Sequence, residues 1–356
     1  RQSFVDFTSD YSDTETEVTR LGTNIGLTDQ WFVEAELTST DVEKDVQNSF
    51  RSWVVTTPSS VNSKQNEFTP RLIGVLPVNG GDMVVTVGMD IRETDYESGI
   101  TNINDDQKVL SYYGQVVIPV VERLSLTLGG RHSKVENDVV RYVAEEVNDR
   151  ATVFEAGARF QYTSNLSFFT RIDENFRFAK VDELTYAPPG QPLDNQKGKS
   201  KELGIEWTAK DMYAKLFVYR LELKDEIAFD PTAAAPTGAP AYFGPGANVN
   251  LDSTVHDGFV IDSKYSVSPA FDLIANYTYS DAAFDSGALE GNSISGVPEK
   301  MFTLASSYSY SNSLKAYAEV IYTGDQYKSG DNANTDPKHG SYSVMNVNAD
   351  YNWQEW

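Results

Sequence analysis

The stretch FDLIANYTYS, residues 271–280, indicates the fold class because its side chains alternate in character. One face of an extended strand would carry apolar residues: Phe271, Leu273, Ala275, Tyr277 and Tyr279. The other face would carry polar residues: Asp272, Asn276, Thr278 and Ser280. Successive side chains of a strand point to opposite faces. One face of this strand therefore meets an apolar medium and the other meets water.

Composition limits the partners of the chain. Its 356 residues include 52 Asp and Glu against 29 Lys and Arg, which gives a net charge of -23. Nucleic acid calls for a basic surface, so we expect no nucleic-acid partner.

The chain has no Cys and hence no disulfide or Cys-ligated metal. It begins at Arg1 without an initiator Met or an apolar signal segment, from which we expect a processed or truncated product.

The same alternation recurs along the whole chain. It is clear in DMVVTVGMDIR from residue 82, TVFEAGARFQY from residue 152 and SLKAYAEVIY from residue 313. Counting such segments gives about fifteen candidate strands by their period of two. The sequence contains no run of 18 or more apolar residues, so we expect no transmembrane helix. The sequence therefore predicts an all-β, antiparallel fold.

The connections between these segments alternate in length. Seven short turns lie at residues 28–30, 79–82, 121–123, 164–165, 209–211, 268–270 and 311–313. Long polar stretches separate them, among them STDVEKDVQNSF, DYESGITNINDDQ and VENDVVRYVAEEVNDR. Such alternation gathers the short turns at one end of a sheet, as in an outer-membrane barrel. We therefore expect Phe271, Leu273, Ala275 and Tyr277 to face outer-membrane lipid. A soluble β-sandwich or propeller is the alternative.

Several segments resemble TonB-dependent outer-membrane receptors. LSLTLGGRHSKVEND (124–138) is similar to a strand of that family that ends in Gly-x-Arg-aromatic, with His132 at the aromatic position. FFTRIDENFRFAKVDELTY (168–186) and KGKSKELGIEW (197–207) resemble two further segments in the family's order, although Ala179 replaces a Pro. The resemblance covers nearly the whole chain.

The resemblance implies a partial outer-membrane barrel over residues 1–356, with about fifteen strands of a barrel of about 22. It also implies an N-terminal plug and a TonB box outside this sequence, through which the intact protein contacts the TonB complex. The implied function is active uptake of a scarce small-molecule chelate, such as a ferric siderophore, or of a vitamin. A passive porin or a surface adhesion barrel remains the alternative.

Candidate ligand residues lie in two polar connections. Tyr186, Tyr242 and Phe243 are aromatic residues among turn formers, and they would stack on a ligand near the mouth of the barrel. Arg177 and Lys180 are the nearest cations for an anionic ligand. In a porin, five charged residues would instead tune the channel: Glu155, Arg159, Arg171, Lys315 and Glu319.

Other chemistry has little support in the sequence. The three His are scattered, and no hydrolase, metalloprotease or P-loop motif occurs. We therefore expect no enzyme activity and no cofactor. The loop SGDNANTDPKHG offers oxygen ligands for Ca²⁺ at Asp331, Asn332, Asn334 and Asp336, but it lacks the spacing of an EF-hand.

Overall fold

The computed structural model describes residues 11–47, 59–99, 103–140, 144–184, 186–188, 192–236 and 244–353. Within them lie eighteen strands and one helix of four residues. Their bounds are β1 (Tyr11–Gly26), β2 (Trp31–Gln47), β3 (Ser59–Phe68), β4 (Arg71–Val78), β5 (Gly81–Ser98), β6 (Ile103–Val121), β7 (Leu124–Val140), β8 (Ala144–Gln161), β9 (Leu166–Arg177), α1 (Val181–Leu184), β10 (Gln196–Thr208), β11 (Met212–Lys224), β12 (Ile227–Asp230), β13 (Ala247–Asn250), β14 (Thr254–Ser268), β15 (Phe271–Phe284), β16 (Lys300–Ser309), β17 (Leu314–Thr323) and β18 (Tyr342–Tyr351).

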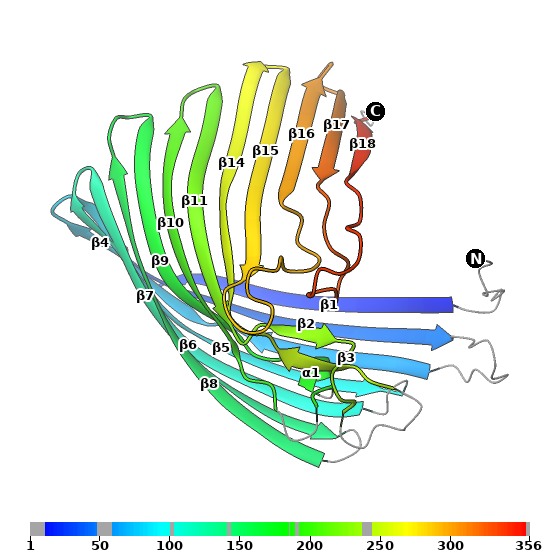
Figure 1. The fold of residues 1–356 in the computed structure, drawn as a ribbon. Coiled ribbons are helices and arrows are strands. Elements are labelled where there is room, and N and C mark those ends of the chain that lie inside the picture. Colours follow the sequence, from blue (N-terminus) through cyan, green and yellow to red (C-terminus); the bar gives the residue numbers. More distant parts are fainter. Residues whose placement is uncertain are drawn as a thin grey trace.

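Sixteen of the strands form one antiparallel sheet whose spatial order follows the chain. β3 and β4 share one position between β2 and β5, so the sheet has fifteen positions from β1 to β18. The sheet curves into a wall, with α1 inside the curve (Figure 1). The predicted all-β antiparallel class is confirmed, whereas a total of about 22 strands stays a prediction.

The seven short connections are present where the sequence placed them. They join β1 to β2, β4 to β5, β6 to β7, β8 to β9, β10 to β11, β14 to β15 and β16 to β17. In an antiparallel sheet ordered along the chain, these turns share one edge of the wall. The other edge carries the long connections, two of which contain α1 and the hairpin of β12 and β13.

Three of the stretches expected to be long polar loops are largely strand instead. β2 runs to Gln47. β5 ends at Ser98 and β6 begins at Ile103, while β7 ends at Val140 and β8 begins at Ala144. Buried and exposed residues still alternate in these extensions, but the exposed residues on the outer face are mostly polar. In β6, Ile103, Asp105, Gln107, Val109 and Ser111 are buried, while the residues between them are not. The polar outer face was therefore mistaken for a loop.

The strands of the first half are consequently long. β5, β6 and β8 contain 18, 19 and 18 residues, whereas β16, β17 and β18 contain 10 each. A tilted membrane span needs only about 9–11 residues. The first half of the wall thus extends well past the length of one span.

The register defines an inner and an outer face. The Gln107 side chain donates to the Ala179 carbonyl beside α1, which marks its face as the inner one. Directly paired residues share a face, as do residues two apart on a strand. Following the pairs from Gln107 through each neighbouring strand brings Asn276 onto the inner face. The predicted lipid-facing residues therefore lie on the outer face: Phe271, Leu273, Ala275 and Tyr277.

The outer face exposes large apolar side chains. Phe154 is 63% exposed, Leu203 61%, Val218 52% and Val347 71%. The two buried apolar clusters of the described residues lie instead in the long connections and at the end of β15 that leads into one of them. One comprises Ala179, Leu193 and Ile227, and the other Ala282, Phe284 and Ile294. This is the reverse of a soluble protein, in which apolar residues gather inside. No helix in the described part of the chain is long and apolar enough to cross a membrane.

Candidate ligand-binding site

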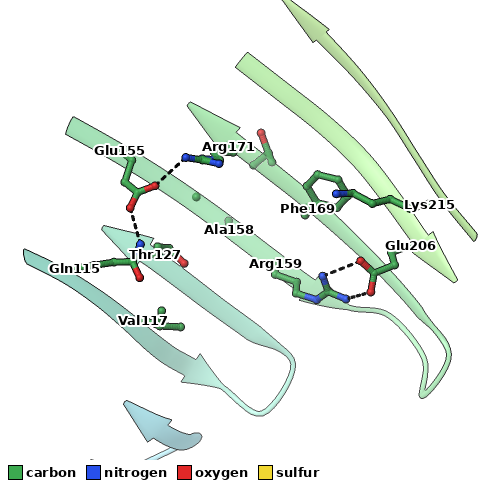
Figure 2. Close-up of a pocket in the computed structure, with 12 residues that line it drawn as sticks. Gln115, Val117, Thr127, Glu155, Ala158, Arg159, Phe169, Arg171, Glu206 and Lys215 are labelled. Carbon is green, nitrogen blue, oxygen red and sulfur yellow. Dashed lines mark hydrogen bonds and ion pairs between the residues drawn. The ribbon is translucent and has the colours of Figure 1, made fainter. Parts of the chain in front are cut away.

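A cavity of about 430 Å³ opens on the inner wall, lined by residues of β6 to β11 (Figure 2). Its charged residues are Glu155, Arg159, Arg171, Glu206 and Lys215. They lie close to the short turns, for example Arg159 two residues before the end of β8 and Glu206 two before the end of β10. The cavity therefore lies near the short-turn edge of the wall and far from the long connections.

Arg159 and Glu206 form a two-pronged ion pair across the cavity. Arg159 Nη2 lies 2.6 Å from Glu206 Oε1, and Nη1 lies 3.3 Å from Oε2. The parallel geometry suits the planar guanidinium and fixes both side chains. The Arg159 side chain is 43% exposed and that of Glu206 is 19% exposed, so the pair lies on the open inner face of the wall and not in a dry core.

Glu155 on β8 links β6 and β9. Its Oε1 accepts from Gln115 Nε2 at 2.6 Å, and its Oε2 accepts from Arg171 Nη2 at 3.2 Å (Figure 2). Arg171 Nε also lies 3.3 Å from Asp173 Oδ1. Glu155 on β8 and Asp173 on β9 thus hold Arg171 in place, and Gln115 extends the network to β6. The result is a wall of fixed, paired charges.

Lys215 is held differently, between aromatic rings. Its Nζ lies 5.0 Å from the ring centre of Phe169 and 4.8 Å from that of Phe217. Gly204 makes this approach possible, because a Cβ there would lie 2.3 Å from Phe169 Cζ and 2.7 Å from Phe217 Cβ. The two rings attract the ammonium through their π faces.

The structure brings together three of the five charged residues named for a porin wall. Glu155, Arg159 and Arg171 line this one cavity. Lys315 and Glu319 lie apart on β17, where Glu319 accepts from Asn346 and from the Tyr317 hydroxyl. Sequence reasoning missed Glu206 and Lys215. The period of two along β10 and β11 could have revealed them, because it places Glu206 and Lys215 on the same inner face as Glu155, Arg159 and Arg171.

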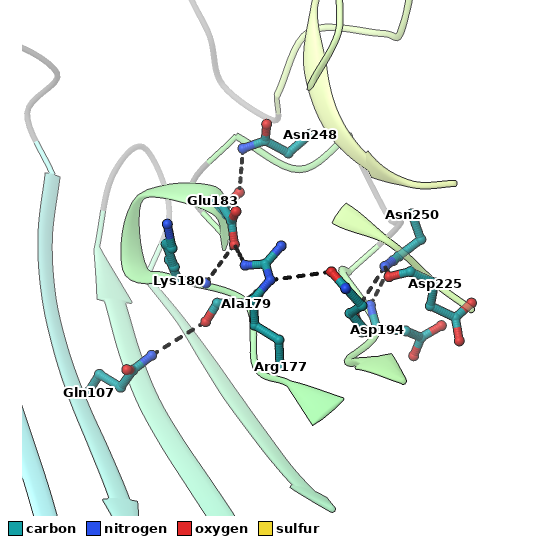
Figure 3. A network of polar contacts seen from close by, with 10 residues as sticks. Gln107, Arg177, Ala179, Lys180, Glu183, Asp194, Asp225, Asn248 and Asn250 are labelled. Carbon is teal, nitrogen blue, oxygen red and sulfur yellow. Dashed lines mark hydrogen bonds and ion pairs between the residues drawn. The ribbon is translucent and has the colours of Figure 1, made fainter. Parts of the chain in front are cut away.

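The predicted ligand cation Arg177 has a structural role. Its Nη1 lies 2.6 Å from Glu183 Oε2, and its Nε donates to Gln196 Oε1 at 3.3 Å (Figure 3). The backbone N–H of Lys180 donates to the same Glu183 oxygen at 2.8 Å, and the Lys180 side chain is exposed. Arg177 therefore shapes the connection between β9 and β10, and its role in ligand binding stays a prediction.

The same connection is bonded to the β12–β13 hairpin. Asn248 donates from its side chain to the Glu183 carbonyl at 3.1 Å, and its backbone N–H donates to the Tyr186 carbonyl at 2.8 Å. Asn250 donates to the carbonyls of Asp194 and Asp225 (Figure 3). Tyr186 is thus part of a unit that lies inside the wall. Tyr242 and Phe243 lie outside the described residues.

A second cavity, of about 250 Å³, lies among three long connections. Glu226 and Phe229 line it from residues 225–253, which include the hairpin, Ser295 from residues 285–299, and Asn332 from residues 324–341. This cavity could not be predicted from the sequence, because its walls come together only through contacts between loops.

The loop considered for Ca²⁺ uses its oxygens internally. Asp331 accepts from the backbone N–H groups of Thr335 and Asp336. Asn332 Oδ1 accepts from the Ser295 hydroxyl, and Asn334 Oδ1 accepts from the backbone N–H of Ser293. No group of three or more potential metal ligands from His, Asp and Glu occurs within the described ranges.

The comparisons with known proteins agree with this architecture. The family model "TonB dependent receptor-like, beta-barrel" matches residues 1–356. The chain is 24% identical over 239 residues to the ferrichrome outer membrane transporter/phage receptor of Escherichia coli, covering 64% of this chain and 29% of that protein. It thus spans less than a third of that relative's length.

Solved structures show the same fold. The ferric-catecholate import receptor Fiu of Escherichia coli in its closed form matches with a TM-score of 0.77 and 16% identity, covering 98% of this chain and 59% of that one. The siderophore receptor PiuA of Acinetobacter baumannii matches with a TM-score of 0.76 and 18% identity, over the same shares of the two chains. The chain accordingly belongs to the TonB-dependent receptor-like β-barrel family.

Proposed function

We propose that this chain forms much of the barrel of an outer-membrane receptor that actively takes up a scarce ligand. The ligand is a ferric siderophore or another metal chelate, or a vitamin. The support is the family, together with relatives described as a ferrichrome transporter and siderophore receptors.

One structural observation carries the proposal: the sheet is apolar outside and charged inside. Side chains such as Phe154 and Leu203 are exposed on the outer face, while Arg159, Glu206, Arg171 and Glu155 are paired on the inner face. In a bilayer, a closed sheet of this kind satisfies its backbone groups and encloses a polar lumen. This arrangement supports an outer-membrane location for the whole protein.

Energy coupling belongs to the whole protein. A barrel of about 22 strands is too wide to be filled by its own side chains, and its lumen is plugged in transporters of this size. We infer that a plug from the rest of the protein fills the lumen and that the TonB complex acts on it. The charged wall near the short turns offers fixed partners for polar groups of such a plug.

A passive porin is the second candidate, and the same charged wall supports it. Arg171 and Arg159 are 50% and 43% exposed toward the lumen, as in an aqueous channel. Planar-bilayer recording of the full-length protein separates the two functions. A receptor should show no steady conductance without denaturant, whereas a porin should conduct at once.

Binding to the purified full-length protein tests the uptake proposal. Ferric trihydroxamates, ferric tris-catecholates and a cobalamin-type vitamin should be titrated against it, with the metal-free chelators as controls. A receptor should bind at least one ferric chelate or cobalamin-type vitamin much more tightly than the metal-free chelator. Failure of every such probe to bind, combined with an open conductance, would contradict the proposal.

A further inference from the structure

We propose that the cavity between the three long connections binds an alkylammonium group, so that the ligand of this receptor carries a cationic arm. The inference rests on the proposed function and specifies its ligand. It concerns the cavity of about 250 Å³ lined by Glu226, Phe229, Ser295 and Asn332, which we call the loop cavity.

The connection between β11 and β14 supplies a carboxylate and an aromatic ring to the loop cavity. Glu226 Oε2 accepts from the Thr254 hydroxyl at 3.1 Å, which orients the carboxylate. Phe229 is 53% exposed and is placed by Gly246, whose added Cβ would lie 2.7 Å from Phe229 Cζ. A carboxylate and an open aromatic face are the two groups that attract an organic cation.

The opposite wall of the loop cavity is held by hydrogen bonds. Ser295 Oγ donates to Asn332 Oδ1 at 2.7 Å and accepts from the Gly330 N–H at 3.2 Å. Asn292 Nδ2 donates to the Asn332 carbonyl at 3.1 Å. These bonds join residues 285–299 to residues 324–341. The cavity is therefore preformed, which lowers the entropy lost when a ligand binds.

Charge around the loop cavity favours a cation. The connections over residues 225–253, 285–299 and 324–341 carry four, three and three carboxylates, against two lysines. Both lysines are paired: Lys328 lies 3.4 Å from Asp336, and Lys338 lies 3.4 Å from Glu299 and 3.5 Å from Asp325. Within the described part of these connections, no unpaired Lys or Arg awaits an anionic ligand.

The neighbouring histidine does not cancel the charge of Glu226. His256 lies at the end of β14 far from the short turn, and its Nε2 is buried. Burial lowers the pKa of His256, and nearby Glu226 only partly opposes this. The imidazole is therefore neutral at pH 7, and the Glu226 carboxylate keeps its attraction for a cation.

The size of the loop cavity fits an arm rather than a whole chelate. Pockets for drug-sized ligands occupy about 300–1,000 Å³. A cavity of about 250 Å³ suits a chain of a few methylenes that ends in an ammonium. The metal-binding part of the ligand would then lie outside the cavity, toward the lumen.

A matched pair of probes tests the inference on the full-length protein. The first is a linear ferric trihydroxamate with one terminal primary ammonium, and the second is the same chelate with that amine acetylated. We expect the ammonium form to bind at least tenfold more tightly. Glu226→Gln keeps the acceptor for Thr254 and should bring the ratio close to one. Glu290→Gln, at an exposed carboxylate that does not line the cavity, should leave the ratio unchanged.

The outcomes separate this inference from the proposed function. Equal binding of the two chelates, or a ratio that Glu226→Gln leaves unchanged, would overturn the inference while uptake of ferric chelates stands. n-Pentylammonium, with n-pentanol as its control, probes the cavity without iron. Amine binding that depends on Glu226, in a protein that binds no chelate, would support the cavity and overturn the proposed function. Absence of binding by every probe would overturn both.

Discussion

Asp105 shows what a single residue does in the extended part of the wall. It lies at the end of β6 far from the short turn, is 1% exposed, and its carboxylate oxygens have no hydrogen-bond partner among the described residues. Burial, with the nearby charges of Asp106 and Asp138, raises its pKa to about 7. An ordinary Asp has a pKa of about 3.9. The folded state therefore favours the protonated acid.

Stability should accordingly depend on pH through this residue. Between about pH 4 and pH 7 the folded protein binds a proton that the unfolded chain has released. The free energy of unfolding then falls as pH rises, by up to about 1.4 kcal/mol per unit, and levels off above pH 7. Asp105→Asn should remove this slope, as measured by urea unfolding in lipid, and the exposed Asp95→Asn should retain it. An unchanged slope in Asp105→Asn would show that another group titrates.

Gly204 provides a second test at the residue scale. Gly204→Ala would place a Cβ 2.7 Å from Phe217 Cβ, an atom that moves only with its backbone. Overpacking of this kind costs about 1–3 kcal/mol. Gly114→Ala is the control, because its Cβ would meet Val87 at an ordinary 3.6 Å. Unfolding midpoints should fall for Gly204→Ala only, and equal midpoints would show that the aromatic pair around Lys215 adapts freely.

At the scale of elements, the strand pattern was predictable and the connections were not. A period of two depends only on neighbours in sequence, so FDLIANYTYS and the short turns could be assigned directly. The extension of β6 could not, because the burial of Asp105 and Gln107 depends on α1 and its connection lying over them. The loop cavity likewise depends on contacts between segments far apart in the chain, such as Ser295 and Asn332.

The two faces of β15 should respond differently to charge. Ala275 lies on the outer face, five residues into the strand, and Ala275→Arg should cost about 2–4 kcal/mol if lipid covers it. Asn276→Arg places the same charge on the inner face, directly opposite Asp262, and should cost far less. Unfolding from lipid vesicles measures both. Equal costs would contradict the assignment of the outer face to the membrane.

At the scale of the whole molecule, the curved wall has two open edges within its described part. β1 and β18 each pair on one side only, and every residue of both strands is exposed. Unpaired edges are not stable in a bilayer, so we propose that further strands of the complete protein close the sheet. In the proposed closed barrel, a plug in the lumen would make the protein a receptor, whereas an open lumen would make it a passive pore.

Uptake by whole cells, with and without a proton gradient, tests the central claim most directly. Cells that express the full-length protein should accumulate a labelled ferric chelate that the protein binds, and cells without it should not. When an uncoupler collapses the gradient, accumulation should stop while binding at the cell surface persists. Accumulation that continues in uncoupled cells, and rises linearly with external chelate, would contradict active uptake and establish passive diffusion through the barrel.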